Sequence, residues 1–268
     1  GGVPIGLASG QASPPFPRVD GGVTCVVPDG AGGWYIGGVF TRVGGQLRLN
    51  LARILADGTL SAWNPGANNS VSALALSGGK LFVGGSFTSI GGQLRNRIAA
   101  VDTTSGAATA WYPSPGTNGF VGSLVVSGGK VYLGGGFTEI GLIPRNWIAA
   151  VEEASGAVTS WNPGADGIVS ALAVNGSTVY AGGAFTNIGG SPRDHIAALS
   201  AGSGAATGWS PSANAEVSTI ALSGSTVYAG GYFTSINGTA RNYVAALESS
   251  SGSLTSWNPN ANARLTRL

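Results

Sequence analysis

An all-β fold made of one repeated unit is predicted by three observations. The phrase Gly-Gly-x-Phe-Thr occurs five times, in steps of 47, 50, 48 and 48 residues. Apolar residues within each copy alternate with a period of two, as in strands, and Gly, Ser, Asn and Pro separate the runs. An Arg follows each Phe by eight positions, and a Trp closes each copy. Repeats of this length indicate a modular array in which each copy forms one supersecondary unit.

The second copy illustrates the elements expected in all five. It predicts four strands, at residues 71–76, 81–87, 98–101 and 107–111. No stretch has the 3.6-residue period and capping residues of a helix. Four short antiparallel strands in about 48 residues are typical of one β-propeller blade. The sequence therefore predicts a single propeller domain over residues 1–268, with four-stranded blades at approximately 18–63, 64–111, 112–161, 162–209 and 210–257.

Small and aromatic residues recur at fixed places in the predicted blades. Gly84 and Gly85 lie within a strand, where a missing side chain usually marks close approach of another backbone. The pair Ala99-Ala100 indicates a thin part of the sheet in the same way. The recurring Phe and Trp residues are predicted to fill the space between blades.

The joint signature of the repeat is Trp-Asn-Pro, Gly-Gly-x-Phe-Thr, Gly-Gly-x-x-Arg-Asn and Ile-Ala-Ala. This signature resembles the delta-60 repeat of secreted and surface-attached bacterial propeller proteins, and the similarity extends over nearly the whole chain. The sequence departs from it at Gly141-Leu142 and Asn237-Gly238, where the second glycine pair is replaced, and after Trp111 and Trp209. The resemblance implies a secreted or cell-surface location and brings no catalytic motif.

The two ends of the chain resemble parts of one further repeat. Residues 1–17 align with the third and fourth strands of a copy, and residues 258–268 align with the entry to a first strand. Propellers often close by building one blade from both ends, which removes exposed sheet edges. We expect a six-bladed ring whose last blade is shared between the termini. A five-bladed ring with spare terminal strands is the alternative.

Charge is sparse, at 9% of residues with a formal net charge of +2. The basic residues are mostly single arginines, so no basic run could follow a phosphate backbone, and nucleic acid is not an expected partner. No apolar segment reaches the length of a membrane span, so we expect no membrane insertion. The chain is therefore expected to have a protein or self-assembly partner, with a glycan as the alternative.

Antiparallel order predicts which loops share a face. The loops after the fourth and second strands of a copy emerge together, and they are longer and richer in Asn and Arg than the tight hairpins opposite. Binding residues concentrate in long loops on a rigid scaffold. The predicted binding residues on this face are Arg48, Arg95, Arg145, Arg193, Arg241, Asn64, Asn162 and Asn258. Each Arg has a second interpretation, in which its guanidinium donates to loop carbonyls of the adjacent blade.

Catalytic and metal-binding patterns are weak in this sequence. His195 is the only histidine and Cys25 the only cysteine, which leaves no ordinary zinc site and no nucleophilic triad. Asp29 lies in a Pro-Asp-Gly sequence that favours a hairpin turn, with calcium binding as the less favoured interpretation. We therefore expect no enzyme activity, no cofactor and no metal.

Two functions fit these observations. The first is a non-catalytic extracellular or cell-surface propeller that acts as a scaffold or adhesion module through protein contacts. The sparse charge and a mean hydropathy of +0.23 favour it, since monomer surfaces are normally richer in charge. The second is a lectin-like propeller with one carbohydrate site per blade, by analogy with other propellers.

Overall fold

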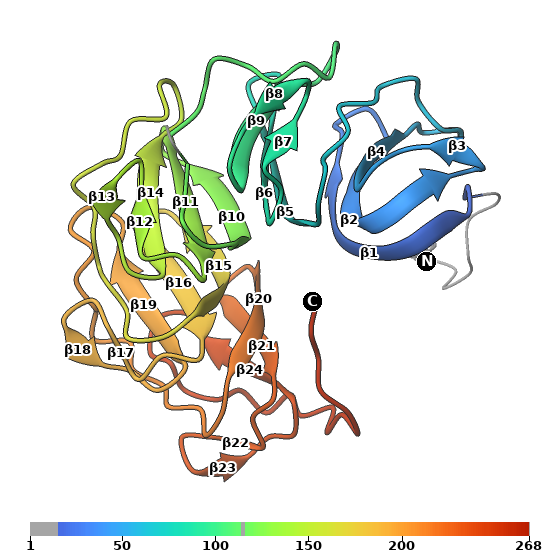
Figure 1. Ribbon diagram of the computed structural model, residues 1–268. Helices are drawn as coiled ribbons and strands as arrows, with labels where there is room; N and C mark the ends of the chain where they lie inside the picture. The colour runs from blue at the N-terminus through green and yellow to red at the C-terminus, as the bar shows by residue number, and fades with distance from the viewer. Residues whose placement is uncertain (1–15, 114–115, 268) are drawn as a thin grey trace. The chain divides into compact units, whose positions relative to one another are not determined.

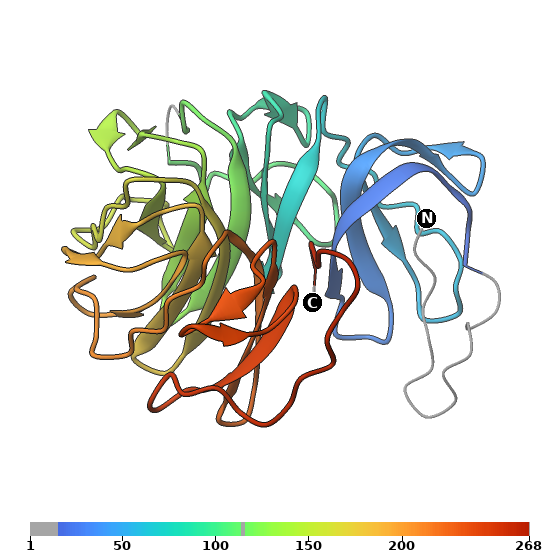
Figure 2. The ribbon, with the colours of Figure 1, turned by 90° about the horizontal axis from the view of Figure 1, so that it is seen from below.

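The computed structural model describes residues 16–113 and 116–267. The chain divides into two compact units, Gly1–Val126 and Ser127–Leu268. Among the described residues every regular element is a β-strand (Figure 1). The strands within a sheet are visibly twisted (Figure 2), as the chirality of the backbone requires.

The first unit contains the strands of the first two repeats and the first strand of the third. Its strands are β1 Val19–Pro28, β2 Trp34–Val43, β3 Gln46–Leu47, β4 Leu51–Ile54, β5 Val71–Ser77, β6 Lys80–Gly85, β7 Ser89–Ile90, β8 Gln93–Leu94, β9 Ile98–Asp102 and β10 Val121–Ser127, whose last residue belongs to the second unit. The sheets have the orders β1-β2-β3, with β4 also paired to β2, and β5-β6-β9.

The second unit repeats the same pattern. Its strands are β11 Lys130–Gly135, β12 Glu139–Ile140, β13 Ile143–Pro144, β14 Ile148–Glu152, β15 Val169–Asn175, β16 Thr178–Gly183, β17 Asn187–Ile188, β18 Ser191–Pro192, β19 Ile196–Ser200, β20 Val217–Ser223, β21 Thr226–Gly231, β22 Ser235–Ile236, β23 Thr239–Ala240 and β24 Val244–Glu248. Every pairing is antiparallel, as in β15-β16-β19 and β20-β21-β24.

The prediction of a regular fourth strand in each repeat is wrong. Residues 107–111 make only the isolated bridge between Val101 and Ala108. The hydroxyl of Thr109 donates to the Ala100 carbonyl at 3.1 Å and accepts from the Trp111 amide at 3.2 Å. Side-chain hydrogen bonds of this kind compete with the strand ladder. The main sheets of the second to fifth repeats therefore have three regular strands each, with the fourth segment attached along the edge.

The predicted long loop after the second strand contains a small hairpin of its own. In the second repeat, Ser89 pairs with Leu94 and Ile90 with Gln93. The two turn residues, Gly91 and Gly92, have φ of +58° and +77°, as a type I′ turn requires. The sequence did not predict these hairpins, since two-residue strands are too short to show an alternating pattern.

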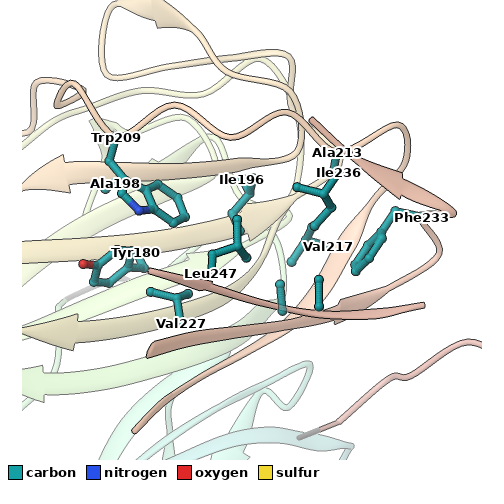
Figure 3. Packing of buried hydrophobic residues seen from close by; sticks show 12 residues of the cluster. Tyr180, Ile196, Ala198, Trp209, Ala213, Val217, Val227, Phe233, Ile236 and Leu247 are labelled. Atoms are coloured by element: carbon teal, nitrogen blue, oxygen red, sulfur yellow. The ribbon is translucent and has the colours of Figure 1, made fainter. Parts of the chain in front are cut away.

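The recurring aromatic residues lie in the core between neighbouring sheets, as predicted. Phe87, Phe137, Phe185 and Phe233 are fully buried. In the second unit the indole of Trp209 meets the ring of Tyr180 edge to face, with centroids 5.2 Å apart (Figure 3). The Trp209 indole nitrogen donates to the Glu248 carbonyl at 2.9 Å. Trp257 is the exception to this burial, since 44% of its surface is exposed.

Close packing between sheets explains the glycines within the strands. A Cβ added to Gly84 would lie 2.7 Å from the Val121 side chain. At the end of the chain, a Cβ added to Gly230 would lie 3.0 Å from Cβ of Leu265. The Ser218 hydroxyl also donates to the Leu265 carbonyl at 2.9 Å, as Thr24 donates to Val71 at 2.7 Å.

Leu265 thus contacts Gly230 as Val71 contacts Gly37, while the assignment of residues 258–268 to a first strand remains a prediction. The counterpart at the other terminus, residues 1–15, lies outside the described residues. The number of blades and the closure of the ring remain predictions.

Candidate functional site

The five repeated arginines hold their own hairpins in place. In Arg95, Nη1 donates to the Leu94 carbonyl at 2.9 Å and Nη2 to the Thr109 carbonyl at 3.0 Å. The corresponding Nη2 bonds in the other repeats are 2.5 to 3.1 Å long. The second interpretation was wrong about the acceptors, because they lie in the same repeat and not in an adjacent blade. The members of this set are Arg48, Arg95, Arg145, Arg193 and Arg241.

Part of each guanidinium remains without a partner. The Nε atoms of all five arginines are buried and have no hydrogen-bond acceptor among the described residues. The other predicted binding residues, Asn64, Asn162 and Asn258, directly follow the Trp that closes a repeat and are exposed. Ligand binding by these eight residues remains a prediction.

A second polar set, missed in the sequence, joins the two loops predicted to share a face. Asn68 Oδ1 accepts from the amides of Thr88 and Ser89 at 2.8 and 3.0 Å. Asp166 and Asn214 make the equivalent contacts in the second unit. The neighbouring Ala67 and Ile90 form a β-bridge. The recurrence of Asn or Asp at this position was the available signal, but Asn is common in turns for other reasons.

The carboxylate of Asp166 is held in its ionised form. Burial opposes ionisation, but hydrogen bonds from Asn187 and Thr186 outweigh it, so the pKa of Asp166 lies well below its usual range. Four donors reach the two oxygens, from the amides and side chains of these two residues. Such bonds favour the charged form of a carboxyl group.

Each repeat has a residue shortly after the small hairpin whose backbone is in the left-handed region, although that residue is never glycine. Its φ lies between +60° and +67°. The backbone explains the conformation, since the amide of His195 donates to the Phe185 carbonyl and its own carbonyl accepts from Gly183, both at 3.0 Å. The His195 Nδ1 atom also lies 3.2 Å from the Gly183 carbonyl. The position is occupied by Asn50, Arg97, Trp147, His195 and Tyr243.

The small hairpins present aliphatic side chains to solvent. Leu94 is 80% exposed, and Leu47, at the same position of the first repeat, is 54% exposed. In the third repeat Leu142 is 70% exposed and Ile143 is 41% exposed. We call these four residues the tip aliphatics. In the third, fourth and fifth repeats the position of Leu94 is held by Pro144, Pro192 and Ala240.

Leu142 is unfavourable for two reasons. It occupies the second turn residue with φ +66°, a position that Gly45, Gly92, Gly190 and Gly238 hold in the other repeats. A left-handed conformation costs an L-residue with a bulky side chain roughly 1–2 kcal/mol. The exposed leucine also gains nothing from burial in the free chain.

A cavity of about 670 Å³ lies in the first unit, beside the tight hairpins. It is therefore on the face opposite the predicted binding loops. The ion pair of Arg53 and Asp29 lines it, with 2.9 and 2.7 Å from Nε and Nη2 to one carboxylate oxygen. The Arg53 guanidinium lies over the Tyr35 ring, 5.4 Å from its centroid. Burial raises the pKa of Tyr35, and the charge of Arg53 opposes that shift.

Asp29 does form the predicted hairpin turn. Its other oxygen accepts from the amides of Ala31 and Gly33 at 2.8 and 2.7 Å. Burial raises the pKa of Asp29, but the backbone amides and Arg53 outweigh it and hold the pKa below its ordinary value. Both carboxylate oxygens are therefore occupied by protein donors.

Metal-ligand clusters and membrane-spanning helices are absent from residues 16–113 and 116–267. No cluster of three or more His, Cys, Asp or Glu side chains is arranged to hold a metal ion there. The described residues also form no helix that is long and apolar enough to span a membrane. Cys25 is half-buried, and its Sγ lies 3.7 Å from the Val71 carbonyl.

Comparison with known families gives a match to a model described as a domain of unknown function (DUF5122) beta-propeller. The matched segments are residues 32–60 and 77–99, which include the second strands, the small hairpins and the recurring glycines of the first two repeats. No curated protein matches the chain.

Several solved structures have a similar arrangement of strands. The extracellular domain of BT4673 from B. thetaiotaomicron superposes with a TM-score of 0.56 at 13% identity, over 91% of this chain and 29% of that one. The Pan2 WD40 domain of Neurospora crassa gives 0.54 at 9% identity, over 89% and 66%. The computationally designed Ika8 protein gives 0.50 at 13% identity, over 92% and 90%. Identities this low bear on the fold alone, and with the repeated antiparallel sheets and the family match they support a β-propeller.

Proposed function

We propose that this chain is a non-catalytic extracellular or cell-surface propeller module that makes protein contacts through its tip aliphatics. Leu142 is the observation that carries the proposal. It is exposed and left-handed at a turn position where four other repeats have glycine. Backbone strain that persists at an exposed site supports a functional hypothesis.

The energetics of the tip aliphatics favour a contact over an open surface. Burying one leucine side chain against a partner stabilises by about 1.5–3 kcal/mol. Such a gain would exceed the cost of the strained turn at Leu142. The polar groups beside the tip aliphatics would add less binding energy to such a contact. The repeated arginines already donate two hydrogen bonds each within their own repeat.

Self-association is the first form of contact to test. Sedimentation velocity over a wide concentration range should show mass rising with concentration for the wild-type chain. The variant L47S/L94S/L142S should remain monomeric, whereas the control V26S/V39S, which changes two exposed valines on β1 and β2, should behave as wild type.

A heterotypic contact needs a second measurement. Crosslinking on intact producing cells should capture a neighbour with the wild-type chain and lose it with L47S/L94S/L142S. The proposal fails if the wild-type chain is monomeric throughout and both proteins capture the same neighbours. Protease treatment of those cells tests the location, since an intracellular chain would survive it.

A lectin-like module with one carbohydrate site per blade is the second candidate. The fivefold recurrence of an arginine with a buried, unpartnered Nε favours it. Changing Arg95, Arg145 and Arg193 to Ala in turn should lower the number of bound glycans in steps, measured on a glycan array and by calorimetry. An array without saturable binding to the folded wild-type chain would exclude it.

A further inference from the structure

The cavity at Arg53 is lined by residues that differ from those at the same positions of the other repeats. The register that pairs Arg53 with Tyr35 pairs alanines with the aromatic residues of the other repeats, as Ala100 pairs with Phe82. The first hairpin is also three residues longer, because five residues separate Pro28 from Trp34 and two separate Ser77 from Lys80. These two changes bring a charged pair to a place where other repeats have small apolar residues.

The sheet register forms in the other repeats without such an ion pair. Desolvating two charges costs several kcal/mol per ion, and apolar residues of similar volume are often as stable or better. Ala150, Ala198 and Ala246 occupy the position in repeats with the same sheet register. A buried ion pair beside a cavity is thus a candidate binding site with a physical reason.

The geometry of the pair leaves one side of the guanidinium available. The Asp29 side chain is 1% exposed and that of Arg53 is 24% exposed, so the cation faces the cavity. Both contacts to Asp29 use Nε and Nη2. The Nη1 edge therefore points away from the carboxylate, and an arginine edge of this kind binds a second carboxylate in two parallel hydrogen bonds.

Charge and rim chemistry define the class of ligand. Asp29 balances Arg53, so the site favours a monoanion over sulfate or phosphate, whose second charge Asp29 would repel. Hydroxyl-bearing Ser61, Thr103 and Thr104 also line the cavity. Its volume of about 670 Å³ lies within the usual range for small-molecule sites.

We propose that this cavity binds a hydroxylated monocarboxylate, such as a sugar acid, with the carboxylate on the Nη1 edge of Arg53 and the hydroxyls on the threonine rim. The site lies on the tight-hairpin face of the first unit and is independent of the protein contact proposed above. A failure of either proposal leaves the other standing.

Nuclear magnetic resonance titration of the full chain with sodium D-glucuronate tests the proposal. Amide signals of Gly79, Thr103 and Thr104 should shift saturably. D-Glucose, acetate and sulfate should bind at least about tenfold more weakly, since each lacks one part of the recognition. Absence of saturable shifts at these amides, or equal binding of sulfate or glucose, would overturn it.

Two variants connect binding to the guanidinium. R53K keeps the charge and the ion pair but removes the planar fork, and it should weaken glucuronate binding by about tenfold. The double variant D29A/R53A removes both charges together, so that neither is left buried alone, and should abolish the shifts while the rest of the spectrum keeps its dispersion. Unchanged affinity in R53K would contradict the assignment, as would binding that persists in D29A/R53A.

Discussion

Leu142 links backbone conformation to surface chemistry at the scale of one residue. The variant L142G should raise the free energy of unfolding by up to about 1 kcal/mol, because relief of the left-handed strain exceeds the entropy cost of glycine. The matched control is L94G, in which the leucine lies in strand β8, beside the corresponding turn of the second repeat. That change should instead lower the free energy of unfolding by about 0.5–1 kcal/mol.

Urea unfolding of both variants provides the measurement. The opposite signs are the important feature, since a general effect of removing exposed leucine would move both values in the same direction. A loss of stability in L142G would mean that the side chain stabilises the free chain, and the main argument for a contact at the tips would disappear.

Asp166 gives a prediction about pH. Its folded pKa is lowered, so its ionised form contributes stability fully above the unfolded pKa of about 4 and loses that contribution as pH falls below it. Asn68 and Asn214 make the same backbone contacts, so D166N should keep the loop. As the pH falls from neutral to 3, the free energy of unfolding of the wild type should therefore decrease more than that of D166N.

The measurement is thermal unfolding of both proteins across this range. S235A, near an uncharged copy of the same site, serves as the control for general acid effects. A difference between wild type and D166N that stays constant with pH would show that the Asp166 hydrogen bonds do not favour the charged form.

These residues also show how far sequence reasoning reached. The repeat made Arg95 and its counterparts conspicuous, and Leu142 stood out against a glycine pair. The acceptors of the arginines could not be predicted, because they depend on where the fourth segment lies after folding. Asn68 was missed, since its contact with Thr88 joins two loops that only the sheet register brings together.

At the scale of the element, the strand pattern predicted the first three strands of a repeat well. The fourth was harder, because Thr109 combines a high strand propensity with a hydroxyl that bonds the neighbouring backbone. In the small hairpins the turn at Gly91-Gly92 is clear from the sequence. The two-residue strands beside it are too short to show an alternating pattern of apolar and polar residues. In both segments tertiary contacts, and not local propensity, decided which residues form regular strands.

The closing tryptophans provide a matched pair within the second unit. Trp161 is buried, its ring centroid is 5.1 Å from that of Tyr132, and its nitrogen donates to the Ser200 carbonyl at 2.9 Å. W161A should lower the free energy of unfolding by about 3–5 kcal/mol. Trp257 is 44% exposed at the same repeat position, so W257A should cost far less, on the order of 1 kcal/mol.

Chemical denaturation followed by circular dichroism measures both changes without relying on the substituted fluorophore. W161F keeps a ring against Tyr132 but loses the indole donor, and an intermediate loss is expected. Equal costs for W161A and W257A would show that the two positions are equally buried in solution.

At the scale of the whole molecule, one repeated unit accounts for most of the chain, and the exceptions carry the chemistry. The period of about 48 residues predicted the antiparallel sheets and their core. It could not predict the cavity at Arg53, because alignment treats Arg53 as one more copy of Ala100. Only the cross-strand register with Tyr35 shows that this arginine lies on the cavity side and meets Asp29 from a longer hairpin.

The last segment of the chain offers a test of the repeat at its own end. Leu265 packs against Gly230 and accepts from Ser218, in the manner of a first-strand valine. L265S should therefore lower the free energy of unfolding by about 1 kcal/mol and speed amide exchange in β20 and β21. T266A, at an exposed neighbour, should change neither quantity. If L265S leaves exchange in β20 and β21 unchanged, the segment does not dock on this sheet, and a shared terminal blade would lose its support from this end.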